Sequence, residues 1–146
     1  MNTEFTRYTN GASLAYLGDA VLEVYVRRYL VRLGITDNGE LNRLALRFVK
    51  ATAQSQGMER LLPLLTEEEE YLYKRGRNAH GLSAPKSASA VEYRRATGME
   101  ALFAALDLAG EHERAAALFA AAYADVIARI EQEKGLAPMP VSNEKD

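Results

Sequence analysis

Helical spacing runs through almost the whole of this chain and limits what it can fold into. Apolar residues recur three, four and seven positions apart, whereas the alternation typical of strands is almost absent. A length of 146 residues, of which 48% are hydrophobic, is enough for one domain with its own core. The pattern therefore predicts an all-α domain over residues 1–136, followed by a disordered C-terminal tail, 137–146.

The expected helix boundaries follow from residues that cap a helix and residues that stop one. We expect helices over about 10–33, 37–49, 66–76, 89–109 and 111–135, and a short helical piece over 57–65 that is broken near Pro63. Four consecutive glutamates, beginning at Glu67, lie where carboxylates stabilise a helix dipole, so we interpret them as helix-start chemistry. The segment 76–90 is the one long irregular stretch inside the domain, and such loops often carry function.

Composition excludes several classes of protein. The chain has no cysteine and only two histidines, His80 and His112, which excludes disulfides, thiol chemistry and zinc sites built from thiolates. The N-terminus has no apolar signal core, and no stretch approaches 18 uninterrupted apolar residues. We therefore expect a cytoplasmic protein that neither enters a membrane nor is secreted.

The most apolar predicted helix, over 13–31, contains a carboxylate beside a glycine. The residues that share a helix face with Asp19 are small or apolar: Ala12, Ala15, Leu22 and Val26. A carboxylate in such a stripe needs a hydrogen bond, an opposite charge or a metal ion. Either Asp19 accepts a hydrogen bond at the rim of the core, or it has a metal-binding or catalytic role. Glu23, four residues before Arg27, is by contrast typical of a solvated helix charge.

A second acid repeats this pattern in the helix predicted at 89–109. The face neighbours of Glu100 are again small or apolar: Ala96, Thr97, Phe103 and Ala104. Two such carboxylates facing each other repel unless they share a proton or a cation. With oxygen ligands and no cysteine, the expected cation is hard, Mg²⁺ or Mn²⁺. Asp107 is a weaker third candidate, because its place near the helix end favours a solvated residue.

Basic residues are concentrated between Lys74 and Arg95, although the whole chain carries a net charge of −2. A local basic strip on a mildly acidic protein is typical of selective phosphate contact rather than general electrostatic adhesion. For each cation taken singly, a plain surface charge is the alternative. The candidate phosphate-binding residues are Lys74, Arg75, Arg77, Asn78, His80, Lys86, Arg94 and Arg95.

Two motifs resemble those of the ribonuclease III family. The stretch "LAYLGDAVLEVYV" is similar to the family motif E-x-L-E-F-L-G-D-A-V-L, and "TGMEALFAALDL" is similar to its second acidic motif. The closer resemblance is to the Mini-ribonuclease III family, the short bacterial branch, through "EEE–KRGRNA", "PK" and "YR–AT–EAL". It covers about residues 10 to 130 and implies the helical ribonuclease III-type catalytic domain.

The resemblance also implies a site and a reaction. Asp19 and Glu100 match the family's metal-binding catalytic acids, and the implied reaction is Mg²⁺-assisted hydrolysis of an RNA phosphodiester that leaves 5′-phosphate products, with Mn²⁺ able to substitute. Ala15 and Thr97 stand where longer members of the family carry further acids. We interpret this as a thinner metal shell, which the resemblance implies is usual for the short branch.

The expected partners follow from the same resemblance. It implies a symmetric homodimer acting on double-stranded RNA, with precursor 23S ribosomal RNA as the substrate. Apolar residues on more than one side of the first helix agree with a dimer, the alternative being a monomer with a thick core. Because no separate double-stranded-RNA-binding domain follows the catalytic one in this sequence, we expect particular structured substrates or a helper such as a ribosomal protein.

A different class of function remains open from the sequence. Ala15 and Thr97 favour a non-catalytic helical module that binds RNA or dimerises, whereas the intact Asp19 and Glu100 favour an enzyme. A helical DNA-binding regulator fits less well, because the basic residues centre on a loop rather than on one recognition helix.

Overall fold

The fold is entirely helical over the residues that the structure, a computed structural model, describes: 1–79 and 89–140. Two short 3-10 helices, η1 (Glu4–Arg7) and η2 (Leu62–Leu64), accompany the α-helices. The α-helices of this part of the chain are α1 (Gly11–Arg32), α2 (Asn38–Val49), α3 (Ala51–Leu61), α4 (Glu67–Arg77), α5 (Ala90–Leu108), α6 (His112–Ala122) and α7 (Ala124–Lys134). The all-α prediction is confirmed.

The helix ends have the local chemistry that the sequence predicts. Asn10, Thr66 and Ser89 each accept a hydrogen bond from the amide three residues on, and in each case the side chain at that third position accepts from the cap's own amide. Gly34, just beyond the end of α1, has a φ of +90° that L side chains rarely adopt. The predicted limits of α1, α4 and α5 are therefore confirmed to within about two residues.

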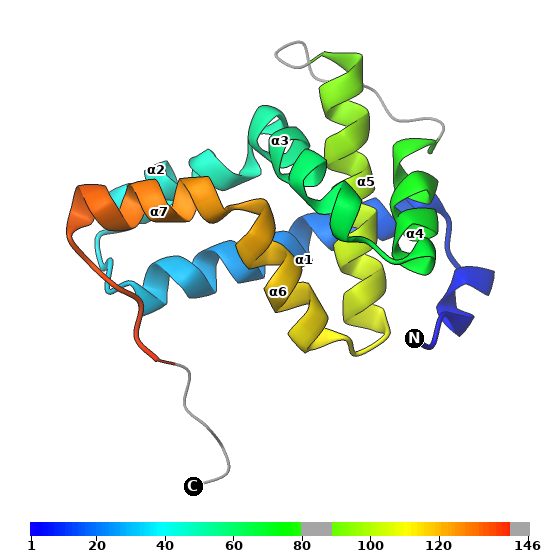
Figure 1. Cartoon of the computed structure of the whole chain (residues 1–146), viewed down its shortest axis with the longest axis horizontal. Helices are drawn as coiled ribbons and strands as arrows, with labels where there is room; N and C mark the ends of the chain where they lie inside the picture. The colour runs from blue at the N-terminus through cyan, green and yellow to red at the C-terminus, as the bar shows by residue number, and fades with distance from the viewer. Residues whose placement is uncertain (80–88, 141–146) are drawn as a thin grey trace, which may run out of the picture.

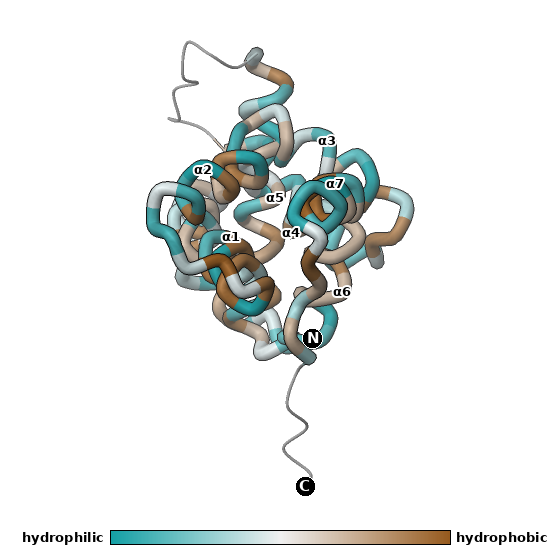
Figure 2. The backbone as a smooth tube through the Cα atoms, turned by 90° about the vertical axis from the view of Figure 1, so that its left-hand side faces the viewer, coloured by the Kyte–Doolittle hydropathy of each residue, from teal (hydrophilic) through white to brown (hydrophobic). Residues whose placement is uncertain are grey.

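The central element is α5, which packs against α1, α3, α4 and α6 (Figure 1). Its side chains from Ala96 to Leu106 are buried with the single exception of Glu100, so α5 has no solvent face over these three turns. The outer helices differ from α5 in their mixture of polar and apolar residues, because hydrophobic (brown) and hydrophilic (teal) segments alternate along α2 and α7 in Figure 2. Because α5 is enclosed, side chains on it meet residues from several other helices.

Two predicted boundaries were wrong. The helix expected over 57–65 begins at Ala51 and ends at Leu61, where η2 takes up Pro63. The helix expected over 111–135 is interrupted at Tyr123, which separates α6 from α7. The Tyr123 ring packs 5.1 Å from the Phe48 ring, and its hydroxyl donates to the Phe48 carbonyl at 3.0 Å. Tertiary packing, rather than a helix-breaking residue, makes this break.

The chain after α7 returns to the end of α1. The Met139 amide donates to the Arg32 carbonyl at 2.9 Å, and the Arg32 guanidinium donates to the Met139 carbonyl at 2.7 Å. Residues 137–140, the described part of the predicted tail, therefore include a point of attachment to α1. In the described segments, every helix is too short or too polar to cross a membrane.

Candidate active site

Asp19 and Glu100 come together where α1 crosses α5. A Cβ atom added to Gly18 would lie 1.7 Å from the Glu100 carbonyl oxygen, so the two backbones touch at this point. Only glycine permits such an approach, which explains the helix-weakening residue in the middle of α1. The next residue on α1, Asp19, then reaches the Glu100 side chain directly.

Burial and the neighbouring Asp19 both act on the Glu100 carboxyl group. Burial, the Asp19 charge and a hydrogen bond to Asp19 together raise the pKa of Glu100 from its ordinary value to about 8. Near neutral pH, Glu100 is therefore mainly protonated. A divalent cation beside both side chains would favour the ionised form of Glu100, because it would offset the charges of the carboxylates.

The exposure of the pair differs from the sequence interpretation in one respect. The buried face of α1 follows a four-residue repeat through Gly18, Leu22 and Val26, and Asp19 lies beside this face as an exposed residue. The expectation that Asp19 sits within an apolar wall was wrong, whereas Glu100 is half-buried among buried neighbours. One carboxylate is thus fixed in the core and the other faces solvent.

The positions that carry further acids in longer family members offer no ligand here. Ala15 is buried and has no polar side chain, and the buried Thr97 hydroxyl donates to the Tyr93 carbonyl at 2.9 Å. Within residues 1–79 and 89–140, no group of three or more acids and histidines could hold a metal ion together. The donor set is the Asp19–Glu100 pair, which fits a hard cation whose remaining ligands are water and substrate.

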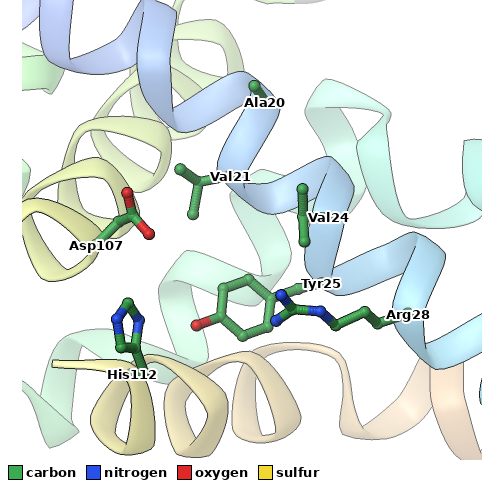
Figure 3. A pocket seen from close by; sticks show the side chains of 7 residues that line it. All are labelled: Ala20, Val21, Val24, Tyr25, Arg28, Asp107 and His112. Atoms are coloured by element: carbon green, nitrogen blue, oxygen red, sulfur yellow. The ribbon is translucent and has the colours of Figure 1, made fainter. Parts of the chain in front are cut away.

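Asp107, the weaker third candidate, does not join the pair. It lines a separate pocket of 310 Å³ between α1 and the turn from α5 to α6. Figure 3 shows its carboxylate near His112, across the pocket from Tyr25 and Arg28. Burial and the Asp107 charge raise the pKa of the Tyr25 hydroxyl, while the Arg28 charge lowers it.

Structural contacts occupy several of the predicted phosphate-binding cations. Lys74 pairs with Glu70 at 3.1 Å, and Arg95 pairs with Glu59. The Arg75 guanidinium donates to the Thr9 carbonyl at 2.9 Å and is half-buried, so it fastens the N-terminal segment to α4. These contacts favour structural roles, above all for Arg75.

Arg77, Asn78 and Arg94 are brought together instead. With Ala79 they line a pocket of 400 Å³ between the end of α4 and the start of α5. The Arg77 guanidinium lies 5.6 Å from the centre of the Tyr73 ring and donates to the Asn78 side chain at 3.2 Å. The predicted residues His80 and Lys86 lie outside the described residues.

The glutamate run has the predicted role and one more. Thr66 caps α4, and all four glutamates lie in its first turn. Glu69 is buried and accepts two hydrogen bonds from Arg114 of α6, at 2.8 and 2.9 Å. Its pKa is lowered, first by the Arg114 hydrogen bond and against the effect of burial. This partner lies 45 residues away in the chain and could not be identified from local sequence patterns.

The helical fold agrees with a Ribonuclease III domain, and the family model of that domain matches residues 12–111. Because the match covers more than half of the chain, the protein belongs to the ribonuclease III family. Members of this family are endoribonucleases that act on double-stranded RNA and generally use divalent metal ions.

Relatives narrow the assignment to the Mini-ribonuclease 3 branch. The Mini-ribonuclease 3 of Symbiobacterium thermophilum is 50% identical over 117 residues, which are 80% of this chain and 89% of that protein. The Mini-ribonuclease 3 of Enterococcus faecalis is 49% identical over 107 residues, 72% of this chain and 81% of its own. A crystal structure of a Fusobacterium nucleatum protein is similar with a TM-score of 0.70 and 28% identity, covering 89% of this chain and 98% of that one.

Proposed function

We propose that this protein is a metal-dependent endoribonuclease that cleaves structured double-stranded RNA, with Asp19 and Glu100 as its metal-binding catalytic residues. The observation that supports it is the carboxylate pair at the α1–α5 crossing, in which the pKa of Glu100 is raised to about 8. Such a perturbed acid, paired with a second acid on a rigid helix crossing, is typical of a functional site. Mg²⁺ is the proposed cofactor, and Mn²⁺ should substitute.

The two carboxylates have different tasks in this proposal. Glu100 would hold the cation in its ionised form, and its enclosed helix keeps this side chain in place. Asp19 would be the second ligand, and its exposure leaves the site open to RNA and solvent. The metal, when bound, would supply a water molecule of lowered pKa and would stabilise negative charge on the phosphoryl and leaving oxygens. The products would then carry a 5′-phosphate.

RNA binding is assigned to the pocket lined by Arg77, Asn78 and Arg94. Cations there would contact backbone phosphates, through which duplex RNA is mainly recognised together with its shape and 2′-hydroxyls. His80 and Lys86 belong to the same proposal on sequence grounds alone. Lys74, Arg75 and Arg95 are weaker members, because each already has a partner within the protein.

A homodimer is part of the same proposal. Tyr16, Val24 and Val31 of α1 are exposed by 86%, 45% and 56%, respectively, so one side of this helix leaves large apolar groups in water. A second copy packed on that side would bury them. Two sites in one dimer would cut both strands of a duplex.

The finer assignments rest on resemblance to Mini-ribonuclease III. We propose precursor 23S ribosomal RNA as a substrate, the cytoplasm as the place of action, and a ribosomal protein as a helper. A second candidate function is a helical RNA-binding module without catalysis. It is favoured by the side chains of Ala15 and Thr97, which provide no ligand where longer enzymes carry acids.

The test is incubation with duplex RNA and Mg²⁺. The wild type should cleave both strands, and Asp19→Asn should reduce the rate by about a thousandfold, equal to about 4 kcal/mol of transition-state stabilisation. Glu23→Gln is the matched control, because Glu23 is a surface acid of α1 that pairs with Arg27 at 2.9 Å. Binding without cleavage by the wild type would favour the non-catalytic module instead.

A further inference from the structure

A second basic pocket lies at the corner between α2 and α3. It has a volume of 430 Å³ and shares no lining residue with the Asp19–Glu100 pair or with the pocket of Arg77 and Arg94. Its charged lining residues come from α2, the corner itself and α7: Arg47, Lys50, Asp125 and Arg129. Three cations and one acid make it positive on a chain whose net charge is −2.

Two of these cations are available to a ligand. Arg47 pairs with Glu133 at 2.9 Å, and Asp125 pairs with Arg60 at 2.8 Å. Lys50 and Arg129 are exposed, and neither forms an ion pair with any residue in the described ranges. Their charges are therefore not neutralised within this part of the protein, and an anion in the pocket would meet both.

The pocket walls are held by contacts on both sides, of which the Tyr123 contact is buried. Tyr123 joins the end of α2 to the start of α7 through its hydrogen bond to the Phe48 carbonyl. Arg60 of α3 donates to the Ala122 carbonyl at 2.8 Å in addition to its pair with Asp125. The cations thus lie around a preformed hollow, which reduces the ordering cost of binding.

Polar groups without charge also line the hollow. Thr52 and Gln56, on successive turns of α3, are exposed side chains that can donate hydrogen bonds to a phosphate or a ribose hydroxyl. Lys50 precedes α3 as its N-cap residue and makes no side-chain cap there. The first turn of α3 therefore adds backbone donors to the same positive environment.

The helix α3 connects this pocket with the proposed RNA-binding surface. Glu59, near the other end of α3, contacts Arg95, the neighbour of Arg94 on α5. Thr52 and Glu59 are separated by about 10 Å along the helix axis. Double-stranded DNA carries about one charge per 1.7 Å of its axis, and at a comparable density a duplex beside α3 would present several phosphates over this distance.

We infer that the Lys50–Arg129 pocket binds backbone phosphates of the RNA substrate at a position away from the cut. The inference rests on the proposed function, since it takes duplex RNA as the ligand. It lengthens the RNA-binding surface from the α4–α5 side of the molecule to the α2–α3 corner. In this way, a single domain gains contacts on a longer stretch of duplex.

The experiment measures binding of a labelled RNA duplex in EDTA by fluorescence anisotropy at several salt concentrations. Lys50→Gln/Arg129→Gln should weaken binding at every salt concentration used and lower the slope of log Kd against log salt by about two, one for each lost phosphate contact. The rate of cleavage at saturating RNA should change much less than the rate at low RNA.

A matched control removes the same amount of charge from α2 and α7, outside the pocket. Arg43→Gln/Lys134→Gln changes one residue of α2 and one of α7, both of which contact Glu40 instead of the pocket. Thermal unfolding of both double variants checks that each is folded. An unchanged salt slope for Lys50→Gln/Arg129→Gln, or an equal fall in the control, would overturn the inference. Failure of the wild type to cleave would instead overturn the proposed function, which the binding data alone do not test.

Discussion

Glu100 makes the stability of the folded domain depend on pH in the absence of metal. Its pKa is about 8 in the fold and near 4.5 when the chain is unfolded, so the fold holds this proton more tightly. The stabilising contribution of Glu100 is fully present below about pH 4.5 and is lost as pH rises toward 8. Above that pH, the effect of Glu100 on the free energy of unfolding no longer changes. An increase in pH over this range should therefore weaken the metal-free protein.

Glu100→Gln should remove this dependence. In EDTA, the free energy of unfolding of the variant should rise relative to wild type between pH 4.5 and 8, by a few kcal/mol at most. Adding Mg²⁺ at pH 8 should restore the wild type and leave the variant unchanged, while the variant loses cleavage. Chemical denaturation across pH provides the measurement, and parallel profiles for the two proteins would contradict the raised pKa of Glu100.

The cations near α4 should separate into structural and RNA-binding residues. Arg75→Ala removes the hydrogen bond to the Thr9 carbonyl and should cost about 1–2 kcal/mol of unfolding free energy. Arg77→Ala/Arg94→Ala should cost no more than about 1 kcal/mol, because both side chains line an open pocket and Arg77 loses only its contacts with the Tyr73 ring and Asn78. The double variant should instead lower the salt slope of RNA binding by about two. Equal losses of stability in both variants would reject this division.

At the scale of the helices, the α1–α5 crossing depends on one missing side chain. Gly18→Ala would place a Cβ 1.7 Å from the Glu100 carbonyl, so the helices must move apart. We expect a loss of about 3 kcal/mol in stability and a fall in cleavage, because separation of the helices also separates the carboxylates. Thermal unfolding and RNA cleavage should both report the change.

Gly39 provides the control for that substitution. It lies in the first turn of α2, where an added Cβ would meet only the end of the Asp37 side chain, at 3.3 Å. Gly39→Ala should stay within about 1 kcal/mol of wild type, with normal cleavage. Similar losses in the two variants would mean that helix propensity, rather than the close crossing, explains Gly18.

Elements that depend on local chemistry were predictable from sequence. Asn10, Thr66 and Ser89 mark helix starts because a cap bonds to its own first turn. The break at Tyr123 was not predictable, because it arises from packing against Phe48, 75 residues away in the chain. Neither alanine nor tyrosine at this junction is a helix breaker.

The candidate site was also predictable from the sequence only in part. Its two acids were identified from motif and face neighbours, and the structure brings Asp19 and Glu100 together. The exposure of Asp19 was missed, because helical spacing gives the neighbours of a residue but not the width of the buried face. The role of Arg75 was also missed, because it depends on the path of the N-terminal segment, which returns to α4.

For the molecule as a whole, the exposed apolar side of α1 should determine the oligomeric state. Tyr16→Glu/Val24→Glu would place two carboxylates against the proposed partner, and burying unpaired charges at such a contact is costly. We expect a dimer for the wild type and a monomer for the variant in sedimentation at micromolar concentration. Tyr71→Glu on α4, where Tyr71 is 60% exposed, is the control and should remain dimeric. A monomeric wild type that still cuts both strands would contradict the dimer.

The enclosure of α5 also determines which opening motions of the protein can expose its backbone. Backbone amides of a helix without a solvent face exchange with deuterium mainly through opening of the whole domain, whereas outer helices such as α7 also exchange through local fraying. We therefore expect the turns of α5 around Glu100 to exchange more slowly than the outer helices among the described residues. In that case local fraying elsewhere leaves the Glu100 carboxylate in place, and this side of the site is lost only when the domain unfolds.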